Sequence, residues 1–504
     1  MIKFSKLLLA SMLFTVVHGA DTTKIVEGKK SEIIDKSITN NMIKSSIVKI
    51  FTVANESDLY EPWASHINKF SGSGCIIDGQ RILTNAHVVS DSTFIEVLKN
   101  GGVKRYEADV LSINHEADLA LITIKDKSFF EGTKSLEFGE LPELQKEVTV
   151  YGFPSGGETL SITKGVISRI EHNNYVHSNK LLLSIQIDAA INGGNSGGPA
   201  ISDDKVVGLV MQSRPYAENM GYIIPPSVIN HYLEDMKDGR CDGYPFLGIK
   251  MQSLDSPVMK RMYGIEGQKY GILINKTIPN SPVDKILKTG DILTAIDGYK
   301  IFSNQKVEFR DKEYTNFRYA LNKHQMGDSV ELTILRNSKE KKVSIKLDKK
   351  PNELSLVKER KHESRPTYFI YGGFVFMPAT ESENGYYSQL LSKYDSEYPN
   401  EKREELVLLT RVLSSSLTKG YDDKTIDVVE TVNGKSFKNF KEFVHIIEHS
   451  KEKFIVLEDK DHFQMVLDRK EVLAKQQRIL EKYYIKSAKS DDLLNPSSKQ
   501  IALK

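Results

Sequence analysis

The chain has little cysteine: only Cys75 and Cys241 occur among its 504 residues. Two half-cystines exclude a small fold held together by several disulfides. Cys75 lies in an apolar, strand-like run, whereas Cys241 lies in a connector rich in glycine and aspartate. A buried thiol and a connector thiol are poorly placed for one bridge, so the sequence predicts two free thiols.

An excess of charge is also lacking, since the formal net charge is +2. Without Lys3 and Lys6, the only formal charges in the first nineteen residues, the chain has 67 basic and 67 acidic side chains. This balance gives no reason to expect a nucleic-acid partner. The hydrophobic share of 39% is that of a globular protein, and the length predicts roughly three domains.

Long hydrophobic runs are absent apart from one near the N-terminus. There Lys3 and Lys6 precede the apolar run 7–17, and the small residues Gly19 and Ala20 follow it. This pattern predicts a signal peptide over residues 1–19, and its bacterial type indicates a periplasmic protein. An uncleaved membrane anchor is the alternative, although the run is short for a bilayer. After signal removal we expect no stable membrane span.

A glycine-rich loop, 191–199, is the most informative segment that is present. Glycines flank Ser196 on both sides and allow backbone conformations that expose its hydroxyl. The backbone of Gly194, Asn195 and Ser196 is then expected to form an oxyanion hole beside that hydroxyl. A simple turn serine is the alternative. A serine nucleophile also needs a base and a group that orients the base.

Both partners are found upstream of this loop. His87 follows an apolar strand pattern, and Asp118 precedes the strand-like run 119–124, so the order is His, Asp, Ser. Each has a simpler reading, as a strand-end histidine and as a strand-end cap. His115 competes for the first role and is expected to be a solvated loop residue. Asp188 competes for the second, but it is expected on a strand that leads away from His87.

Three segments, 84–89, 118–121 and 194–199, resemble the catalytic motifs of HtrA/DegP (Deg) serine proteases. The C-terminal half is more similar to the plant and organelle branch of that family. The resemblance implies a mainly β fold, in which a chymotrypsin-like double β-barrel precedes a PDZ domain and a diverged second PDZ-like domain. It also implies a serine endopeptidase that uses no metal and no organic cofactor.

The domain boundaries follow from composition and from the same resemblance. We expect an N-terminal arm over 20–45, a protease domain over 46–235, a PDZ domain over 245–348, a second PDZ-like domain over 367–472, and a C-terminal helix and tail over 473–504. A short helix beginning near Pro226 should close the protease domain, with Val228, Ile229 and Tyr232 on its apolar face.

In the first PDZ domain, the resemblance assigns carboxylate binding to the loop Phe246, Leu247, Gly248 and Ile249. Its backbone would capture the C-terminus of a peptide that adds a strand to the sheet. The run 428–435 echoes 294–300, which predicts a diverged repeat of this domain. No matching carboxylate loop is found in the repeat, so we expect a structural or oligomer-forming role for it.

Two positions allow predictions of specificity and of activation. Ala190 lies six residues before Ser196, at the position where trypsin has an acid, and Ile191 follows it. These residues predict a small apolar pocket that prefers Val, Ala, Ile or Leu before the cleaved bond. Asn195 stands where trypsin-like zymogens carry an aspartate. We therefore expect activation by loop ordering, with a peptide at the PDZ domain as a possible trigger.

Segment 55–70 carries Tyr60, Trp63 and Phe70, and in the family an N-terminal aromatic cluster joins protease domains into trimers. A homo-oligomer built from trimers is thus one expectation, and local packing of these rings is the other.

The leading function is an endopeptidase for unfolded or damaged exported proteins. A periplasmic chaperone or holdase, and a regulatory protease with one dedicated substrate, remain open.

Overall fold

The computed structural model describes residues 40–213, 220–381, 391–394, 396–421 and 428–495. The predicted signal peptide and most of the predicted arm lie outside these residues. Residues 40–45 form a helix, and Ile43 is buried in the core that the barrels share. The arm predicted over 20–45 therefore needs correction at its C-terminal end. Residues 40–45 pack on the barrels, because the apolar side chain of Ile43 is buried in their shared core.

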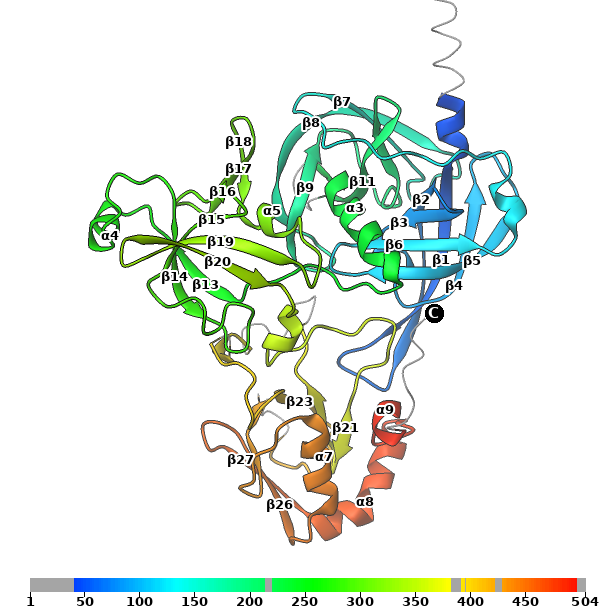
Figure 1. Ribbon diagram of the computed structural model, residues 1–504. Helices are drawn as coiled ribbons and strands as arrows, with labels where there is room; N and C mark the ends of the chain where they lie inside the picture. The colour runs from blue at the N-terminus through cyan, green and yellow to red at the C-terminus, as the bar shows by residue number, and fades with distance from the viewer. Residues whose placement is uncertain (1–39, 214–219, 382–390, 395, 422–427, 496–504) are drawn as a thin grey trace, which may run out of the picture.

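The first half of the described chain forms two closed β-barrels (Figure 1). The first has the strand order β1-β2-β3-β6-β5-β4, from β1 (Ile47–Ser57), β2 (Ser65–Ile77), β3 (Arg81–Thr84), β4 (Ser92–Lys99), β5 (Arg105–Asn114) and β6 (Leu119–Ile124). The second has the order β10-β11-β12-β9-β8-β7, from β7 (Glu147–Gly152), β8 (Ser161–Asn174), β9 (Leu181–Ile187), β10 (Pro199–Ser202), β11 (Lys205–Ser213) and β12 (Gly221–Ile224). Closure leaves neither barrel with an open edge.

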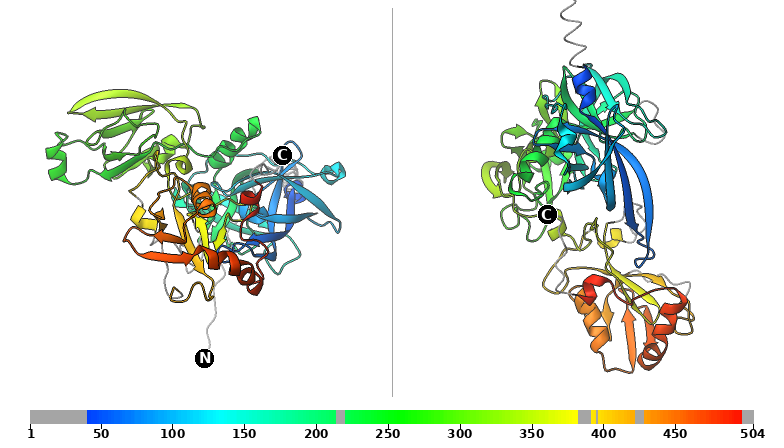
Figure 2. Two further views of the ribbon diagram at one scale, coloured as in Figure 1. Left: turned by 90° about the horizontal axis from the view of Figure 1, so that it is seen from below. Right: turned by 90° about the vertical axis from the view of Figure 1, so that its right-hand side faces the viewer.

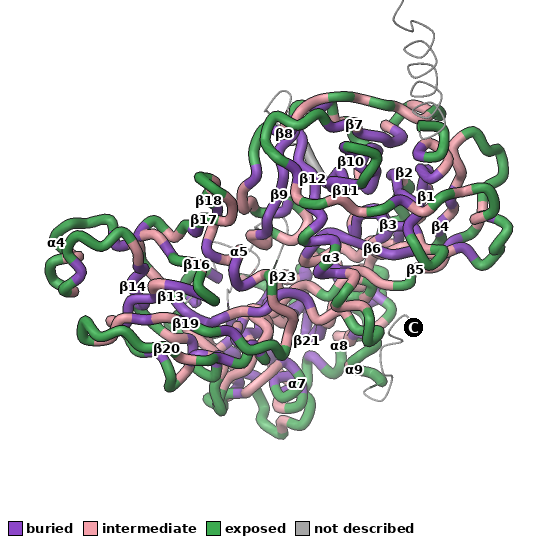
Figure 3. The backbone as a smooth tube through the Cα atoms, turned by 45° about the horizontal axis from the view of Figure 1, so that its top comes forward, coloured by how far each residue is buried: buried purple, intermediate pink, exposed green. Residues whose placement is uncertain are grey.

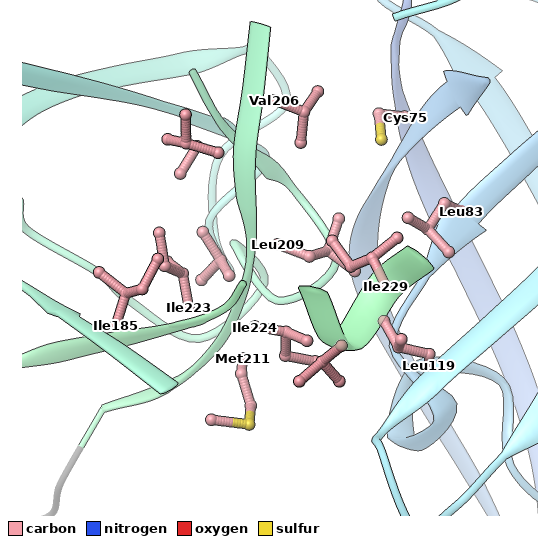
Figure 4. Packing of buried hydrophobic residues seen from close by; sticks show 14 of the residues in the cluster. Cys75, Leu83, Leu119, Ile185, Val206, Leu209, Met211, Ile223, Ile224 and Ile229 are labelled. Atoms are coloured by element: carbon pink, nitrogen blue, oxygen red, sulfur yellow. The ribbon is translucent and has the colours of Figure 1, made fainter. Parts of the chain in front are cut away.

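The interface between the barrels is apolar (Figure 4). Leu83 and Leu119 from the first barrel meet Leu209 and Ile224 from the second, and Ile229 of helix α3 (Pro226–Asp235) lies among them. Val228, Ile229 and Tyr232 of α3 are buried. The predicted closing helix is confirmed, and proline in its first turn is tolerated because no intrahelical donor is lost there. The short elements of this half are α2 (Ala86–Val89), η1 (Lys127–Phe130) and η2 (Met236–Asp238).

The next unit, called the first PDZ unit, is a sheet of order β13-β14-β15-β19-β20, with β13 at an edge. Its elements are β13 (Ile249–Ser253), α4 (Pro257–Met262), β14 (Ile272–Thr277), β15 (Ile292–Ile296), β16 (Tyr299–Lys300), β17 (Lys306–Arg310), β18 (Glu313–Asn316), α5 (Arg318–Leu321), β19 (Ser329–Arg336) and β20 (Lys339–Lys346). In Figure 3, α4 is largely exposed, whereas the central strands β14 and β15 carry more buried residues than β13 and β20.

The second PDZ unit contains one four-stranded and one three-stranded sheet. Its elements and those of the preceding linker are η3 (Pro351–Leu354), β21 (Phe369–Tyr371), β22 (Phe374–Pro378), η4 (Ser392–Tyr394), β23 (Val407–Val412), β24 (Val428–Val429), β25 (Thr431–Val432), α7 (Phe440–His449), β26 (Phe454–Glu458), β27 (Gln464–Asp468), α8 (Arg469–Lys482) and α9 (Asp491–Leu494).

The predicted repeat is confirmed by one turn that both PDZ units share. Asp297 has φ 45° and Asn433 has φ 50°, and a glycine with positive φ follows each. The Asp297 amide donates to the carbonyl of Glu331, and a carboxylate oxygen of Asp297 accepts from the Glu331 amide. Asn433 makes the same pair of bonds with Val456. Short side chains that bond locally tolerate this left-handed backbone.

The C-terminal helix belongs to the second PDZ unit. Ile479 and Leu480 of α8 pack in one cluster with Ile370, and the amide of Ile370 donates to the carbonyl of Ala488. The domain boundary predicted at residue 472 is therefore wrong, because it would cut through one packed core. Residues 496–504 of the predicted tail lie outside the described part of the chain.

A long hairpin of β1 and β2 reaches from the first barrel to the second PDZ unit (Figure 2). The Trp63 ring meets Tyr368 edge-on at 6.1 Å, and Arg411 pairs with Glu61 at 2.6 Å. Trp63 is thus used for packing within the chain, while Tyr60 is 45% exposed. No described helix is long and apolar enough to cross a membrane.

Candidate active site

His87 and Asp118 form the centre of the site. His87 is the second residue of the short helix α2, which follows β3 after Asn85, and Asp118 directly precedes β6, so pairing of β3 with β6 brings the two residues together. The ring Nδ1 of His87 lies 2.9 Å from one carboxylate oxygen of Asp118, and the His87 amide donates to the other at 3.0 Å. Two contacts to one carboxylate fix both the backbone and the ring of His87.

The charges of this pair are mutually stabilised. Burial would lower the pKa of His87, but the charge and hydrogen bond of Asp118 raise the pKa above its ordinary value. Burial would raise the pKa of Asp118, but the facing His87 lowers it. Asp118 is 1% exposed. A buried carboxylate in this position favours the tautomer with Nδ1–H toward it and leaves a lone pair on Nε2.

The backbone of Asp118 adopts φ 53°, which few side chains do easily. The amide group of Asn85, which is fully buried, donates to the Asp118 carbonyl at 2.9 Å. The competing carboxylate, Asp188, instead accepts from the amide of Val166 at 2.6 Å. The structure therefore brings Asp118 to His87, and it holds Asp188 on the second barrel.

The loop of Ser196 can be built only with glycine at two points. Gly194 has φ 94°, and a Cβ there would lie 2.5 Å from the carbonyl oxygen of Phe153. Gly197 has φ 82°, and a Cβ there would lie 2.1 Å from the carbonyl oxygen of Ser73. The glycines predicted to expose Ser196 are thus required both by backbone conformation and by space.

Ser73 is a positioning residue that the motifs did not reveal. Its hydroxyl donates to the Gly194 carbonyl at 2.8 Å and accepts from the Phe153 amide at 2.8 Å. The Ser73 amide also donates to the carbonyl of Ser196. The only hint in the sequence is the alternation of serine and glycine over 71–74, which also suits an ordinary strand turn.

The Ser196 hydroxyl donates to the carbonyl of Met211 at 3.3 Å. Among the hydrogen bonds of the described residues, none joins this hydroxyl to His87. The Ser196 hydroxyl is therefore not engaged with the imidazole of His87 in this structure. Such contacts in unliganded enzymes often tighten only when substrate is present.

The amides around Ser196 differ in their use. The Asn195 amide donates to the carbonyl of Asn192 at 3.1 Å. In the described part of the chain, no hydrogen bond from the amides of Gly194 or Ser196 is found. Of the three residues predicted for the oxyanion hole, Gly194 and Ser196 thus have amides available to a substrate oxygen in this state.

The predicted specificity residues, Ala190 and Ile191, lie in the segment that follows β9. Ala190 is exposed, and its carbonyl accepts from the Thr163 hydroxyl at 3.1 Å. The side chain of Ile191 packs against the backbone of Gly221, where an added Cβ would lie 2.3 Å from the Ile191 Cδ1 atom.

His115 is not the solvated loop residue that we expected. Its Nδ1 contacts His177, and its Nε2 contacts Glu363. These contacts depend on segments far apart in the sequence.

The predicted carboxylate loop leads into the edge strand β13. Gly248 has φ 77°, and a Cβ there would lie 2.1 Å from the Cβ of Ser281. Leu247 is buried, Ile249 pairs with β14, and Phe246 lines a cleft of about 1140 Å³ between the barrels, the linker and both PDZ units. An edge strand offers backbone groups to an added peptide strand.

Comparison with protein families gives three matches along the chain. Residues 72–209 match the trypsin-like peptidase domain, residues 245–347 match a PDZ domain, and residues 357–492 match a second PDZ domain. The two barrels and the two PDZ units described above correspond to these matches. The fold predicted from the sequence, a mainly β protease domain followed by two PDZ domains, is confirmed.

Full-length relatives extend the likeness. The chain is 36% identical over 478 residues to putative protease Do-like 3, mitochondrial, of Arabidopsis thaliana, covering 93% of this chain and 85% of the relative. It is 35% identical over 488 residues to protease Do-like 2, chloroplastic, of the same plant, covering 95% and 79%. A solved structure of a variant of the HtrA-type protease AlgW with a decapeptide shares the fold, with TM-score 0.50 and 20% identity over 62% of this chain and 98% of that one.

Proposed function

Because this chain belongs to the HtrA/Deg family of trypsin-like serine proteases with PDZ domains, we propose that His87, Asp118 and Ser196 are its catalytic triad. The observation that carries the proposal is the bidentate approach of Asp118 to His87 beside the glycine-rich loop of Ser196. The substrates we propose are unfolded or damaged proteins, which expose extended backbone to a protease cleft.

In the proposed reaction, His87 Nε2 accepts the proton of Ser196 as its oxygen attacks the peptide carbonyl. Asp118 holds the ring in the required tautomer and stabilises the imidazolium that forms. The amides of Gly194 and Ser196, with Asn195 shaping the loop between them, bind the negative oxygen of the intermediate. His87 then returns the proton to the leaving amine, and water repeats the cycle on the acyl-enzyme.

Activation would turn the Ser196 hydroxyl from the Met211 carbonyl toward His87 as the loop takes its active conformation. The amides of Gly194 and Ser196 would then receive the substrate oxygen. Loop ordering fits the uncharged Asn195, which offers no partner to a new N-terminus. A peptide C-terminus bound by Phe246, Leu247, Gly248 and Ile249 would be the trigger. The wall formed by Ala190 and Ile191 would admit small aliphatic side chains.

The decisive experiment is digestion of unfolded β-casein by the purified protein and by the Ser196→Ala variant, with mass spectrometry of the products. We expect cleavage after Val, Ala, Ile or Leu that the variant abolishes. Cleavage after Lys or Arg would overturn the pocket assignment. Equal cleavage rates with and without peptides that bind the PDZ unit would count against the trigger.

A chaperone function predicts a different result, because suppression of aggregation by a holdase would persist in Ser196→Ala. A protease with one dedicated substrate would leave β-casein intact and cut a single protein. Both remain alternatives to general proteolysis, since each uses the same folded chain.

Assembly and location complete the proposal. We propose homo-oligomers built from trimers, with the exposed Tyr60 rather than Trp63 as a contact, and sedimentation of Tyr60→Ala tests this. We propose that residues 1–19 direct export to the periplasm. The alternative is a location in an organelle, which the relatives named mitochondrial and chloroplastic favour. N-terminal sequencing of the mature protein after cell fractionation distinguishes the two.

A further inference from the structure

Three histidines meet next to the candidate active site. His115 lies between β5 and β6, His177 lies between β8 and β9, and His362 lies in the linker between the two PDZ units. One ring nitrogen from each lies within 4.8 Å of the others. We call these residues the histidine cluster. Each barrel and the linker supplies one member, so the cluster exists only in the folded chain.

The rings are arranged with nitrogen atoms facing one another. His115 Nδ1 lies 2.8 Å from His177 Nε2. The rings of His115 and His362 are stacked, with centroids 3.7 Å apart and planes at 13°. Neutral imidazoles each offer one lone pair to a ligand, so this packing gathers several donors at one point.

Glu363 fixes the orientation of the central ring. Both of its carboxylate oxygens lie 3.0 Å from His115 Nε2. With its proton on Nε2, His115 presents a lone pair on Nδ1 toward the cluster. The Glu363 amide donates to the Asp91 carboxylate at 2.9 Å, which holds this part of the linker on the first barrel. A carboxylate behind a histidine is the usual outer partner of a metal-binding imidazole.

We propose that His115, His177 and His362 bind a divalent transition-metal ion, Zn²⁺ or a close analogue such as Co²⁺. Three imidazoles with one open position for water form a common tetrahedral zinc environment. Zn–N distances of about 2.0–2.1 Å place the nitrogens of a tetrahedral site roughly 3.4 Å apart. His115 Nδ1 and His177 Nε2, now 2.8 Å apart, would separate slightly around an ion, and the more distant nitrogens, all within 4.8 Å, would move closer.

Metal binding at the cluster ties the linker to the protease domain. His177 also lies beside His87, with ring centroids 6.1 Å apart. The linker is held nearby by Glu359, which pairs with Lys180 at 2.8 Å. The cluster opens onto the cleft between the barrels and the PDZ units, which gives an ion access from solvent. An ion here would clamp the segment that joins the two PDZ units to the rim of the active site.

The test is titration of the full chain carrying Ser196→Ala, which prevents self-cleavage, with Zn²⁺ in a calorimeter and with Co²⁺ in a spectrophotometer. We expect one equivalent of each ion, visible Co²⁺ bands typical of a tetrahedral site, and slower tryptic cleavage of the linker after Lys361. In His362→Ala and His115→Ala, affinity should fall by at least about 100-fold, and in Glu363→Gln by about 10–100-fold.

Two control variants make the test specific. His66→Ala removes a side chain that is 67% exposed and far along the chain from the cluster, and it should leave the titration unchanged. His445→Ala breaks a second stacked histidine pair, His445 and His449 on α7, which lies outside the cluster. Loss of the single equivalent in His445→Ala, or binding unchanged in both His362→Ala and His115→Ala, would overturn the proposal. So would the absence of binding at micromolar Zn²⁺ by a parent protein with native circular dichroism.

Discussion

The hydroxyl of Ser73 lies 2.8 Å from the carbonyl oxygen of Gly194, although 121 residues separate the two. This bond joins strand β2 of the first barrel to the loop that carries Ser196. The same hydroxyl accepts from the Phe153 amide of the second barrel. One fully buried serine therefore links the loop of Ser196 to both barrels.

We expect Ser73→Ala to reduce kcat for peptide cleavage by about 10–100-fold, with a smaller change in KM. The reason is that the Gly194 carbonyl and the Phe153 amide lose a buried partner, which costs about 1–3 kcal/mol. Steady-state kinetics and thermal unfolding measure both effects. Ser71→Ala, two residues away on the same strand, is the matched control and should behave like the parent. Equal kinetics of the two variants would remove Ser73 from the positioning role.

The pH dependence of kcat/KM should report His87. Because Asp118 raises the pKa of His87, a larger fraction of the base is protonated at a given pH, so the acid limb of activity should lie above about 6.5. In Asp118→Asn the charge is lost, burial then lowers the pKa, and the limb should move down while kcat falls by about 10⁴-fold. The rates should be measured in EDTA, so that metal bound at the histidine cluster does not affect the pH profile. A limb that does not move would show that another group controls it.

Both members of the His87–Asp118 pair stabilise the fold, but their contributions depend on pH in opposite directions. The raised pKa of His87 contributes stability below its unfolded value, which is lost as the pH rises through the folded value. The lowered pKa of Asp118 contributes stability above its unfolded value, which is lost as the pH falls through the folded value. Urea unfolding of the parent and of Asp118→Asn from pH 3 to 8 should show a smaller loss of stability toward acid in the variant, because the other carboxylates with lowered pKa, such as Glu363, remain in both proteins.

The variants Gly197→Ala and Gly101→Ala distinguish the effect of steric crowding from the effect of backbone strain on stability. Both glycines have positive φ, 82° and 73°, but only Gly197 is crowded, with the Ser73 carbonyl 2.1 Å from an added Cβ. At Gly101 nothing lies within 4 Å of that position. We expect Gly101→Ala to cost about 1–2 kcal/mol of unfolding free energy and to retain activity. Gly197→Ala should cost clearly more and abolish cleavage, since the nucleophile loop must move.

Both thiols should be unreactive in the native protein. Burial raises the pKa of Cys75 to about 12, and burial together with the charge of Asp235 raises that of Cys241 to about 12. At pH 8 almost no thiolate forms, so labelling by Ellman's reagent should be slow until denaturant is added. Rapid labelling of one equivalent would identify Cys241 as open to solvent, since Cys75 is fully buried.

The sequence by itself determined the features that local signals encode. The motifs around His87, Asp118 and Ser196, the closing helix at Pro226 and the Asn433 turn each depend on a few neighbouring residues whose backbone preferences are strong. Their order along the chain was also enough to indicate the family and the mainly β fold.

Only the tertiary structure decided how distant segments meet. The histidine cluster, the Ser73 bond, the contact of Trp63 with Tyr368 and the packing of α8 into the second PDZ unit each join segments that no periodicity relates. The hydroxyl of Ser196 turning to Met211 was likewise not predictable, because a rotamer depends on every neighbour of the site. Local conformation is set by nearby atoms, whereas these contacts exist only after the barrels, linker and PDZ units have packed.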